Sequence, residues 1–237
     1  MYNSEYINSL TNYNRVLLML NKSEDFYEHS HQLKLKKGEK IYLDAHRDHC
    51  YLIQSGFIQV SNVIDDKPNF LYISQHGDFP VLPVVSKYIP REIRLEVLAD
   101  ALVWVIDFQF LKNCLLLEDP KNFVLISQME NVIIDIARVN TLAQISAQQR
   151  IQYLLEYLAE NFGIVDGQGY RILPPFLTYN KLSEFSNLSK SHTIKIVEKL
   201  KEDGLITIKK GQWIILDIDA IRVSHFFVAP FINRKKY

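Results

Sequence analysis

The sequence predicts an α+β chain with three parts in series: a β-rich first half, one long helix, and two short helices followed by a β-hairpin. Three observations predict this order. Short β-branched segments separated by turn residues fill residues 40–107, no Gly or Pro occurs between residues 121 and 162, and two amphipathic patterns meet at Asn187. We therefore expect a β-roll over 1–118, a helix over 119–145 and a helix-turn-helix domain over 146–237.

The first half begins with a helical pattern around residues 16–20 and continues as strands. Six β-rich segments are expected, at 40–43, 50–54, 57–63, 70–74, 95–98 and 101–107. Turn signals separate them at Lys37-Gly38, Ser55-Gly56, residues 65–68 and His76-Gly77-Asp78. Short strands at such even spacing are typical of a barrel or jelly roll.

The long helix carries a regular row of side chains. Its members are spaced three, four, three, four and three residues apart: Ile126, Met129, Ile133, Ile136, Asn140 and Ala143. This is a heptad seam, and Asn140 takes an a-like position, where a buried amide fixes register in a parallel dimer. The seam could instead pack on the chain's own barrel, but Leu125, Val132 and Val139 are available for that contact. We expect a homodimer.

The C-terminal part begins with a break at Ser146-Ala147 and a further helical run, which ends in the segment 163–169. A short helix, a tight turn at Asn187, and a second helix follow. Their inward positions are apolar: Leu177, Leu182 and Phe185 in the first, and Ile194, Val197 and Leu200 in the second. Asp203-Gly204 ends the second helix, and segments 205–208 and 213–216 form a hairpin around 209–211. This is the pattern of a winged helix-turn-helix.

The second helix suits the DNA major groove. Ser189 is placed as its N-cap, so Lys190, Ser191 and His192 occupy the first turn, and Lys195 follows one turn later. We expect Ser191 and Lys195 to contact bases in double-stranded DNA. Contacts to the DNA backbone are expected from the start of the first helix and from the hairpin tip, together with Lys190: Thr178, Tyr179, Lys209 and Lys210.

Charge supports a local cationic surface. Between residues 176 and 211, seven lysines face four acidic residues, although the whole chain has a net charge of +0. DNA affinity must therefore come from a patch. The alternative is that a winged helix docks onto another protein, and that its lysines form only a solvated face.

Composition argues against disulfide-rich, membrane and secreted classes of protein. The 237 residues are 48% hydrophobic and include only Cys50 and Cys114, which argues against a disulfide scaffold. Apolar runs stay below the roughly twenty residues of a membrane span, and the first residues lack the order of a signal peptide. We expect a soluble, cytoplasmic protein without a membrane partner.

The order of roll, long helix and winged helix resembles the Crp/Fnr family of bacterial transcription regulators over nearly the whole chain. Five strings carry the resemblance: Lys37-Gly38-Glu39-Lys40, Tyr51-Leu52-Ile53-Gln54-Ser55-Gly56, His76-Gly77-Asp78-Phe79, Gln128-Met129 and Arg150-Ile151. It implies a cyclic-nucleotide-binding-like roll, a palindromic DNA site, RNA polymerase as a partner and a possible small-molecule effector. The chain's size and the extension 221–237 also resemble the PrfA-type branch.

The resemblance departs from the cyclic-nucleotide members in the phosphate cassette. There, Phe-Gly-Glu opens the cassette and Arg-Ser or Arg-Thr closes it. Here Phe79 precedes two prolines within residues 80–83, and prolines donate no backbone N–H. The best arginine candidate, Arg91, neighbours Glu92, which would repel a phosphate. We expect no cyclic AMP site.

No cofactor or metal is expected either. Iron–sulfur members need more cysteines than this chain has. His46, His49 and Cys50 are close in sequence, but their spacing matches no zinc pattern, and histidines in such a segment are more often plain polar residues. Cys50 could sense thiols, but a cysteine in an apolar strand is usually inert packing.

The resemblance also fails in part on the DNA-reading helix. The family pattern is Arg-Glu-Thr, two residues, then Arg, whereas this chain has Lys190, Ser191, His192 and then Lys195. We therefore expect a half-site different from the family's usual one. The remaining rival is a cupin-like small-barrel enzyme, which would need a His-x-His and Glu metal set that the sequence lacks. We expect no enzyme.

Overall fold

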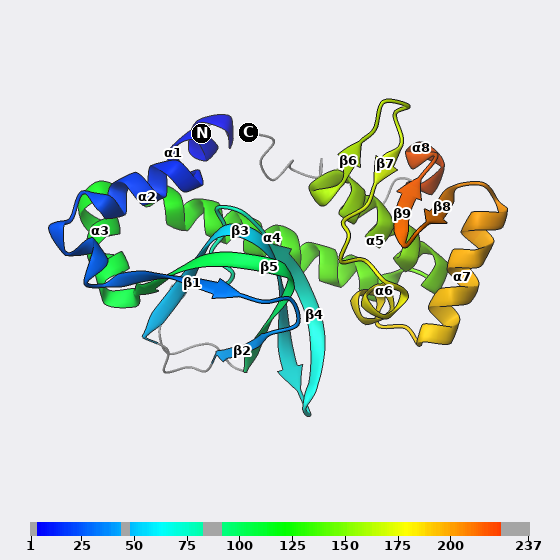
Figure 1. Ribbon diagram of the computed structural model, residues 1–237, viewed down its shortest axis with the longest axis horizontal. Coiled ribbons are helices and arrows are strands. Elements are labelled where there is room, and N and C mark those ends of the chain that lie inside the picture. The colour runs from blue at the N-terminus through cyan, green and yellow to red at the C-terminus, as the bar shows by residue number, and fades with distance from the viewer. Residues whose placement is uncertain (1–3, 44–47, 83–91, 224–237) are drawn as a thin grey trace. The chain divides into compact units, whose positions relative to one another are not determined.

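The computed structural model describes residues 4–43, 48–82 and 92–223 (Figure 1). They fall into two compact units, the roll unit up to Val139 and the winged unit from Asn140. In the roll unit the elements are α1 (Ser4–Thr11), α2 (Tyr13–Asn21), the 3-10 helix η1 (Glu24–Tyr27), β1 (Ser30–Leu35), β2 (Lys40–Leu43), β3 (His49–Ile64), β4 (Lys67–Ser74), β5 (Ile93–Asp107) and α3 (Phe108–Glu118). The long helix α4 (Phe123–Gln144) runs across the unit boundary.

An antiparallel sheet in the order β1-β5-β3-β4 forms the roll, with β2 paired to β5. The two long strands β3 and β5 pair with each other in the middle of this sheet, and β1 and β4 pair with their outer edges (Figure 1). The turn expected at Ser55-Gly56 is therefore wrong, because this point is an irregularity inside β3. Gly56 has φ +96°, and a Cβ there would lie 2.6 Å from the Cβ of Ala101. Close approach of β5 thus requires glycine.

Alternation along the two long strands separates two cores. Ile53 and Val103 face an inner cluster with residues of β1 and β2. Leu52, Trp104 and Ile106 face the opposite way, against side chains of α2, η1 and α3. The indole N–H of Trp104 donates to the hydroxyl of Tyr13 at 3.1 Å. The period-2 pattern therefore places a helical layer on the outside of the roll.

The winged unit contains α5 (Ala147–Phe162), β6 (Ile164–Val165), β7 (Arg171–Ile172), α6 (Tyr179–Ser186), α7 (Lys190–Glu202), β8 (Ile206–Lys209), β9 (Gln212–Ile215) and α8 (Ile218–Ile221). The expected break at Ser146 is a capping box: the Ser146 hydroxyl accepts from the backbone of Gln149, whose side chain accepts from the backbone N–H of Ser146. A four-stranded sheet, β6-β7-β9-β8, includes a hairpin, β6–β7, that the sequence patterns did not predict.

The α+β fold class expected from the sequence is confirmed. Among the described residues, no helix combines the length and apolar character that crossing a membrane would need.

Candidate nucleic-acid interface and partner face

The helix-turn-helix is fixed by local hydrogen bonds of the expected kind. The Thr178 hydroxyl caps α6 by accepting from the backbone N–H of Lys181 at 3.2 Å. Asn187 adopts the left-handed conformation, with φ 52° and ψ 43°, and so allows a tight turn. Ser189 caps α7 by accepting from the backbone N–H of His192 at 3.3 Å. The predicted N-cap at Ser189 is therefore present.

Helix α7 has one buried and one cationic face. Thr193, Ile196, Val197 and Leu200 are buried. The predicted inward residue Ile194 is only half-buried, and Ile196 takes the deeper position. The exposed residues of the helix include those expected to meet DNA: Lys190, Ser191, His192 and Lys195, with Lys199 beside them. The first turn of α7 thus presents polar and cationic groups to solvent.

Strands β8 and β9 form the predicted wing hairpin, with Lys209 paired to Gln212. Lys210 and Gly211 connect them with φ angles of 50° and 80°. Two successive positive φ values define the type I′ turn, whose twist matches that of the strands. Both Lys209 and Lys210 are exposed at this tip.

Ion pairing separates the lysines into two groups. Lys181 pairs with Glu184 at 2.9 Å, and Lys201 pairs with Glu198 at 2.8 Å. The other five form no ion pair among the described residues: Lys190, Lys195, Lys199, Lys209 and Lys210. Two of the four acids are thus already neutralised within the helices, and the uncompensated positive charge is concentrated on α7 and the wing tip.

Tyr179, also expected at the DNA backbone, has a different environment. Its hydroxyl donates to Oε1 of Glu198 at 2.9 Å, and its ring lies edge-on to Trp213 with the centroids 4.9 Å apart. Burial and the hydrogen bond to Glu198 raise the pKa of Tyr179 to about 12. The side chain is half-buried.

Helix α4 presents its predicted seam to solvent. Four of the six seam residues are large apolar side chains that stand in water, and Ile133 and Ile136 each leave more than three-fifths of their surface accessible, at 64% and 63%. Val132, expected to face the roll, is also exposed, so this part of the prediction is wrong. Leu125 and Val139 are less exposed than Val132. The exposed apolar surface is therefore broader than the seam itself.

The inward side of α4 buries a charged pair as well as apolar residues, which the sequence patterns did not indicate. Asp135 and Arg138 are both buried and form an ion pair at 3.1 Å. The Arg138 guanidinium also donates to the carbonyl oxygen of Leu71 in β4 and lies 5.3 Å from the ring centre of Phe70. These contacts add charge and hydrogen bonding to the apolar packing of Val124, which lies in the core of the roll unit.

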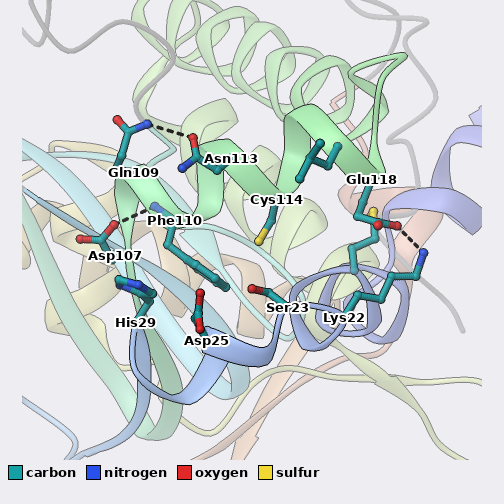
Figure 2. Close-up of a pocket in the computed structure, with 12 residues that line it drawn as sticks. Lys22, Ser23, Asp25, His29, Asp107, Gln109, Phe110, Asn113, Cys114 and Glu118 are labelled. Atoms are coloured by element: carbon teal, nitrogen blue, oxygen red, sulfur yellow. Dashed lines mark hydrogen bonds and ion pairs between the residues drawn. The ribbon is translucent and has the colours of Figure 1, made fainter.

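A cavity of about 430 Å³ lies between α2, η1 and α3. Figure 2 shows His29 and Asp107 at one side of it and the Lys22–Glu118 ion pair at the other. The lining includes three carboxylates but one lysine, so its charge does not suit a phosphate-bearing effector. Burial and the nearby Glu118 carboxylate raise the pKa of the Cys114 thiol, which disfavours the reactive thiolate.

The other ligand candidates are only partly described. His46, Arg91, residues 83–91 of the cassette and residues 224–237 of the extension lie outside the described residues. His49 is exposed, whereas Cys50 is buried and its thiol donates to the carbonyl oxygen of Ile106 at 3.6 Å. Within the described ranges, no three His, Cys, Asp or Glu residues gather as metal ligands.

No protein-family model matches the sequence, and no curated protein matches it either. Solved structures do. A cyclic nucleotide-binding domain containing protein from Listeria monocytogenes has a TM-score of 0.74 and 20% identity, over 88% of this chain and 99% of that one. A CooA variant from Carboxydothermus hydrogenoformans gives a TM-score of 0.69 at 16% identity, over 87% and 93%.

A transcriptional regulator of the CRP/FNR family from Thermus thermophilus gives a TM-score of 0.63 at 16% identity, over 81% of this chain and 96% of that one. The matches cover roll, long helix and winged helix together, because each spans most of both chains. This chain therefore has the fold of the Crp/Fnr regulators, as its sequence resemblance predicts.

Proposed function

We propose that the protein is a sequence-specific transcription regulator that binds double-stranded DNA as a homodimer. The observation that carries this proposal is the group of five lysines without ion pairs, within the described residues, on α7 and the wing tip. A recognition helix in the major groove and a wing on the adjacent phosphates would use these groups together.

The residues divide by chemistry. Ser191 and Lys195 are proposed to contact base edges from the exposed face of α7, with His192 beside them. Thr178, Ser189, Lys190, Lys209 and Lys210 are proposed to contact or approach phosphates, because capping hydroxyls and lysines at helix starts suit anions. The Ser189 and Thr178 hydroxyls accept hydrogen bonds from the backbone and keep their own hydrogen atoms available to donate.

The seam of α4 supplies the second half of the proposal. A homodimer through Ile126, Met129, Ile133, Ile136, Asn140 and Ala143 would cover apolar surface that a lone subunit leaves in water. Two-fold symmetry would then present two α7 helices to a palindromic site. In this proposal residues 1–118 form the sensor-like roll, 119–145 the dimerisation helix and 146–237 the DNA-binding domain.

Other parts of the proposal rest on the fold likeness to regulators. We propose RNA polymerase as a partner, the cytoplasm as the location, and a regulatory role without catalysis. An effector other than cyclic AMP, or no effector, fits the prolines after Phe79 and the acidic lining of the α2–α3 cavity. An effector that acts would have to bind two states of the dimer with different affinities.

The decisive experiment is selection of duplexes from a random DNA pool by the purified protein, without added effector and at a fixed salt concentration. Enrichment of a palindrome is expected. The Lys195→Glu variant should lose that enrichment, because it replaces a groove-facing cation by an anion. A matched control is Lys112→Glu, which reverses an exposed lysine on α3, outside the winged unit.

Normal enrichment by Lys195→Glu would contradict the assigned recognition helix. If the unaltered protein enriched no duplex, this would contradict the proposal that it binds DNA without an effector. A repeat in cell extract then separates a missing effector, which the extract restores, from a winged helix that docks only on protein.

A further inference from the structure

We propose that Tyr179 is a positioning residue of the DNA-binding surface: it holds α7 and the wing in their relative orientation instead of contacting phosphate. The proposal rests on the DNA-binding function proposed above. Its basis is a single side chain that contacts both of the elements on which the five uncompensated lysines lie.

Tyr179 begins α6, directly after the capping Thr178. Its hydroxyl reaches α7, where Oε1 of Glu198 accepts the hydrogen bond at 2.9 Å. The ring reaches the wing, where it lies at 60° to the indole of Trp213. Trp213 belongs to β9 and is only 4% exposed, so it is a fixed surface for the ring.

Glu198 is itself held in place. Its Oε2 accepts a hydrogen bond from Nζ of Lys201 at 2.8 Å, so the carboxylate binds Tyr179 with one oxygen and Lys201 with the other. These two hydrogen bonds lower the pKa of Glu198. The acceptor therefore remains ionised at neutral pH, and the hydrogen bond from Tyr179 is charge-assisted.

The same hydrogen bond argues against a phosphate contact by Tyr179. A tyrosine hydroxyl carries one hydrogen, and here that hydrogen goes to Glu198. With its pKa raised to about 12, the hydroxyl stays protonated and offers only lone pairs to any further group. A phosphate oxygen also offers only lone pairs and would be repelled.

The covalent link between α7 and the wing is short. It runs through Asp203, Gly204 and Leu205, and Gly204 has φ +72°. Backbone hydrogen bonds fix this link: the Leu205 N–H donates to the Leu200 carbonyl oxygen at 3.0 Å, and the Leu205 carbonyl oxygen accepts from the Leu216 N–H at 2.8 Å. Side-chain contacts between the helix and the hairpin add to these local bonds. Tyr179 supplies one contact to each.

The test compares Tyr179→Phe, Glu198→Ala and the double variant on the selected duplex and on a random duplex, across a series of salt concentrations. Tyr179→Phe keeps the ring against Trp213 and removes the hydroxyl. We expect the Kd for the selected duplex to rise about threefold to tenfold and the Kd for the random duplex to rise less. The slope of log Kd against log salt concentration should not change. In the Glu198→Ala background, where the hydrogen bond is already lost, Tyr179→Phe should cause no further loss of affinity for the selected duplex.

A phosphate contact would give a different pattern. Tyr179→Phe would then weaken both duplexes equally, and the loss would be as large in the Glu198→Ala background as in the unaltered protein. Either result, or unaltered binding by Tyr179→Phe, would overturn the proposal. Unchanged thermal unfolding of the variants would show that they remain folded.

A DNA-free measurement separates failure of this proposal from failure of the proposed function. Amide hydrogen exchange of Tyr179→Phe should be faster in β8 and β9 than in the unaltered protein, while α5 stays protected. Equal exchange in the wing would overturn the positioning role even if the protein bound no DNA at all.

Discussion

Helices α4 and α7 expose opposite kinds of side chain. Helix α7 buries Ile196, Val197 and Leu200 and exposes lysines, which is the ordinary arrangement of an amphipathic helix. Helix α4 exposes isoleucines at 133 and 136 and buries the charged pair Asp135 and Arg138. The same physical rules therefore indicate different partners: a polyanion for α7, and an apolar protein surface for α4.

The buried charged pair of α4 is explained by the part of the roll that it faces. Arg138 binds a backbone carbonyl of β4, a group that an apolar side chain would leave without this donor. The buried pair thus favours one register of α4 on the roll, and the exposed apolar residues remain for the second copy of the chain that we propose. On α7 the inner side meets apolar side chains, so no charge is buried there.

The largest expected effect comes from making the outer side of α4 resemble that of α7. The double substitution Ile133→Glu and Ile136→Glu would place four like charges across the proposed two-fold seam, which should dissociate the proposed dimer. Light scattering after size-exclusion chromatography should show monomers. Affinity for the palindrome should fall by about 10²–10⁴-fold, because each half-site is then bound separately.

The matched control for this substitution is Leu117→Glu on α3. Leu117 is 80% exposed, so the same kind of change is made on a helix outside the seam. It should leave the mass and the affinity unchanged. A dimer that survives both seam charges would show that α4 is not the interface.

The next largest effect tests the inner side of α4. Arg138→Met leaves the buried Asp135 carboxylate without its ion pair and should cost about 3–5 kcal/mol of stability in the roll. Adding Asp135→Leu should restore part of it, because the buried carboxylate is then gone while the Leu71 carbonyl oxygen still lacks the Arg138 donor. Urea unfolding followed by fluorescence in a Trp213→Phe background, where Trp104 reports on the roll, measures both variants. A cost below about 1 kcal/mol would instead match a surface ion pair.

The features that the sequence predicted are local ones. The exposed seam follows from the heptad spacing, the N-cap from Ser189 at a helix start, and the wing turn from Lys210-Gly211. Each depends on residues within one turn or one hairpin, where period and backbone preference decide the structure. The fold order followed from combining these local patterns along the chain.

The features that the sequence did not reveal depend on residues far apart in the chain. Gly56 is required by Ala101, Arg138 is buried by Leu71 and Phe70, and the Tyr179 hydroxyl is bound by Glu198. No periodic pattern encodes such pairs. The strands β6 and β7 have two residues each, too few for alternation to be detected.

The smallest expected effect concerns the wing, where charge can be removed without changing the turn. Lys210→Asn keeps a residue that tolerates positive φ and deletes one cation. If Lys210 contacts one phosphate, the slope of log Kd against log salt should fall by about 0.9, and selected and random duplexes should lose affinity about equally. This uniform loss would distinguish the wing from Lys195 on α7, whose substitution should affect the selected duplex most. An unchanged slope for Lys210→Asn would place the wing tip away from DNA and restrict the cationic contact to α7.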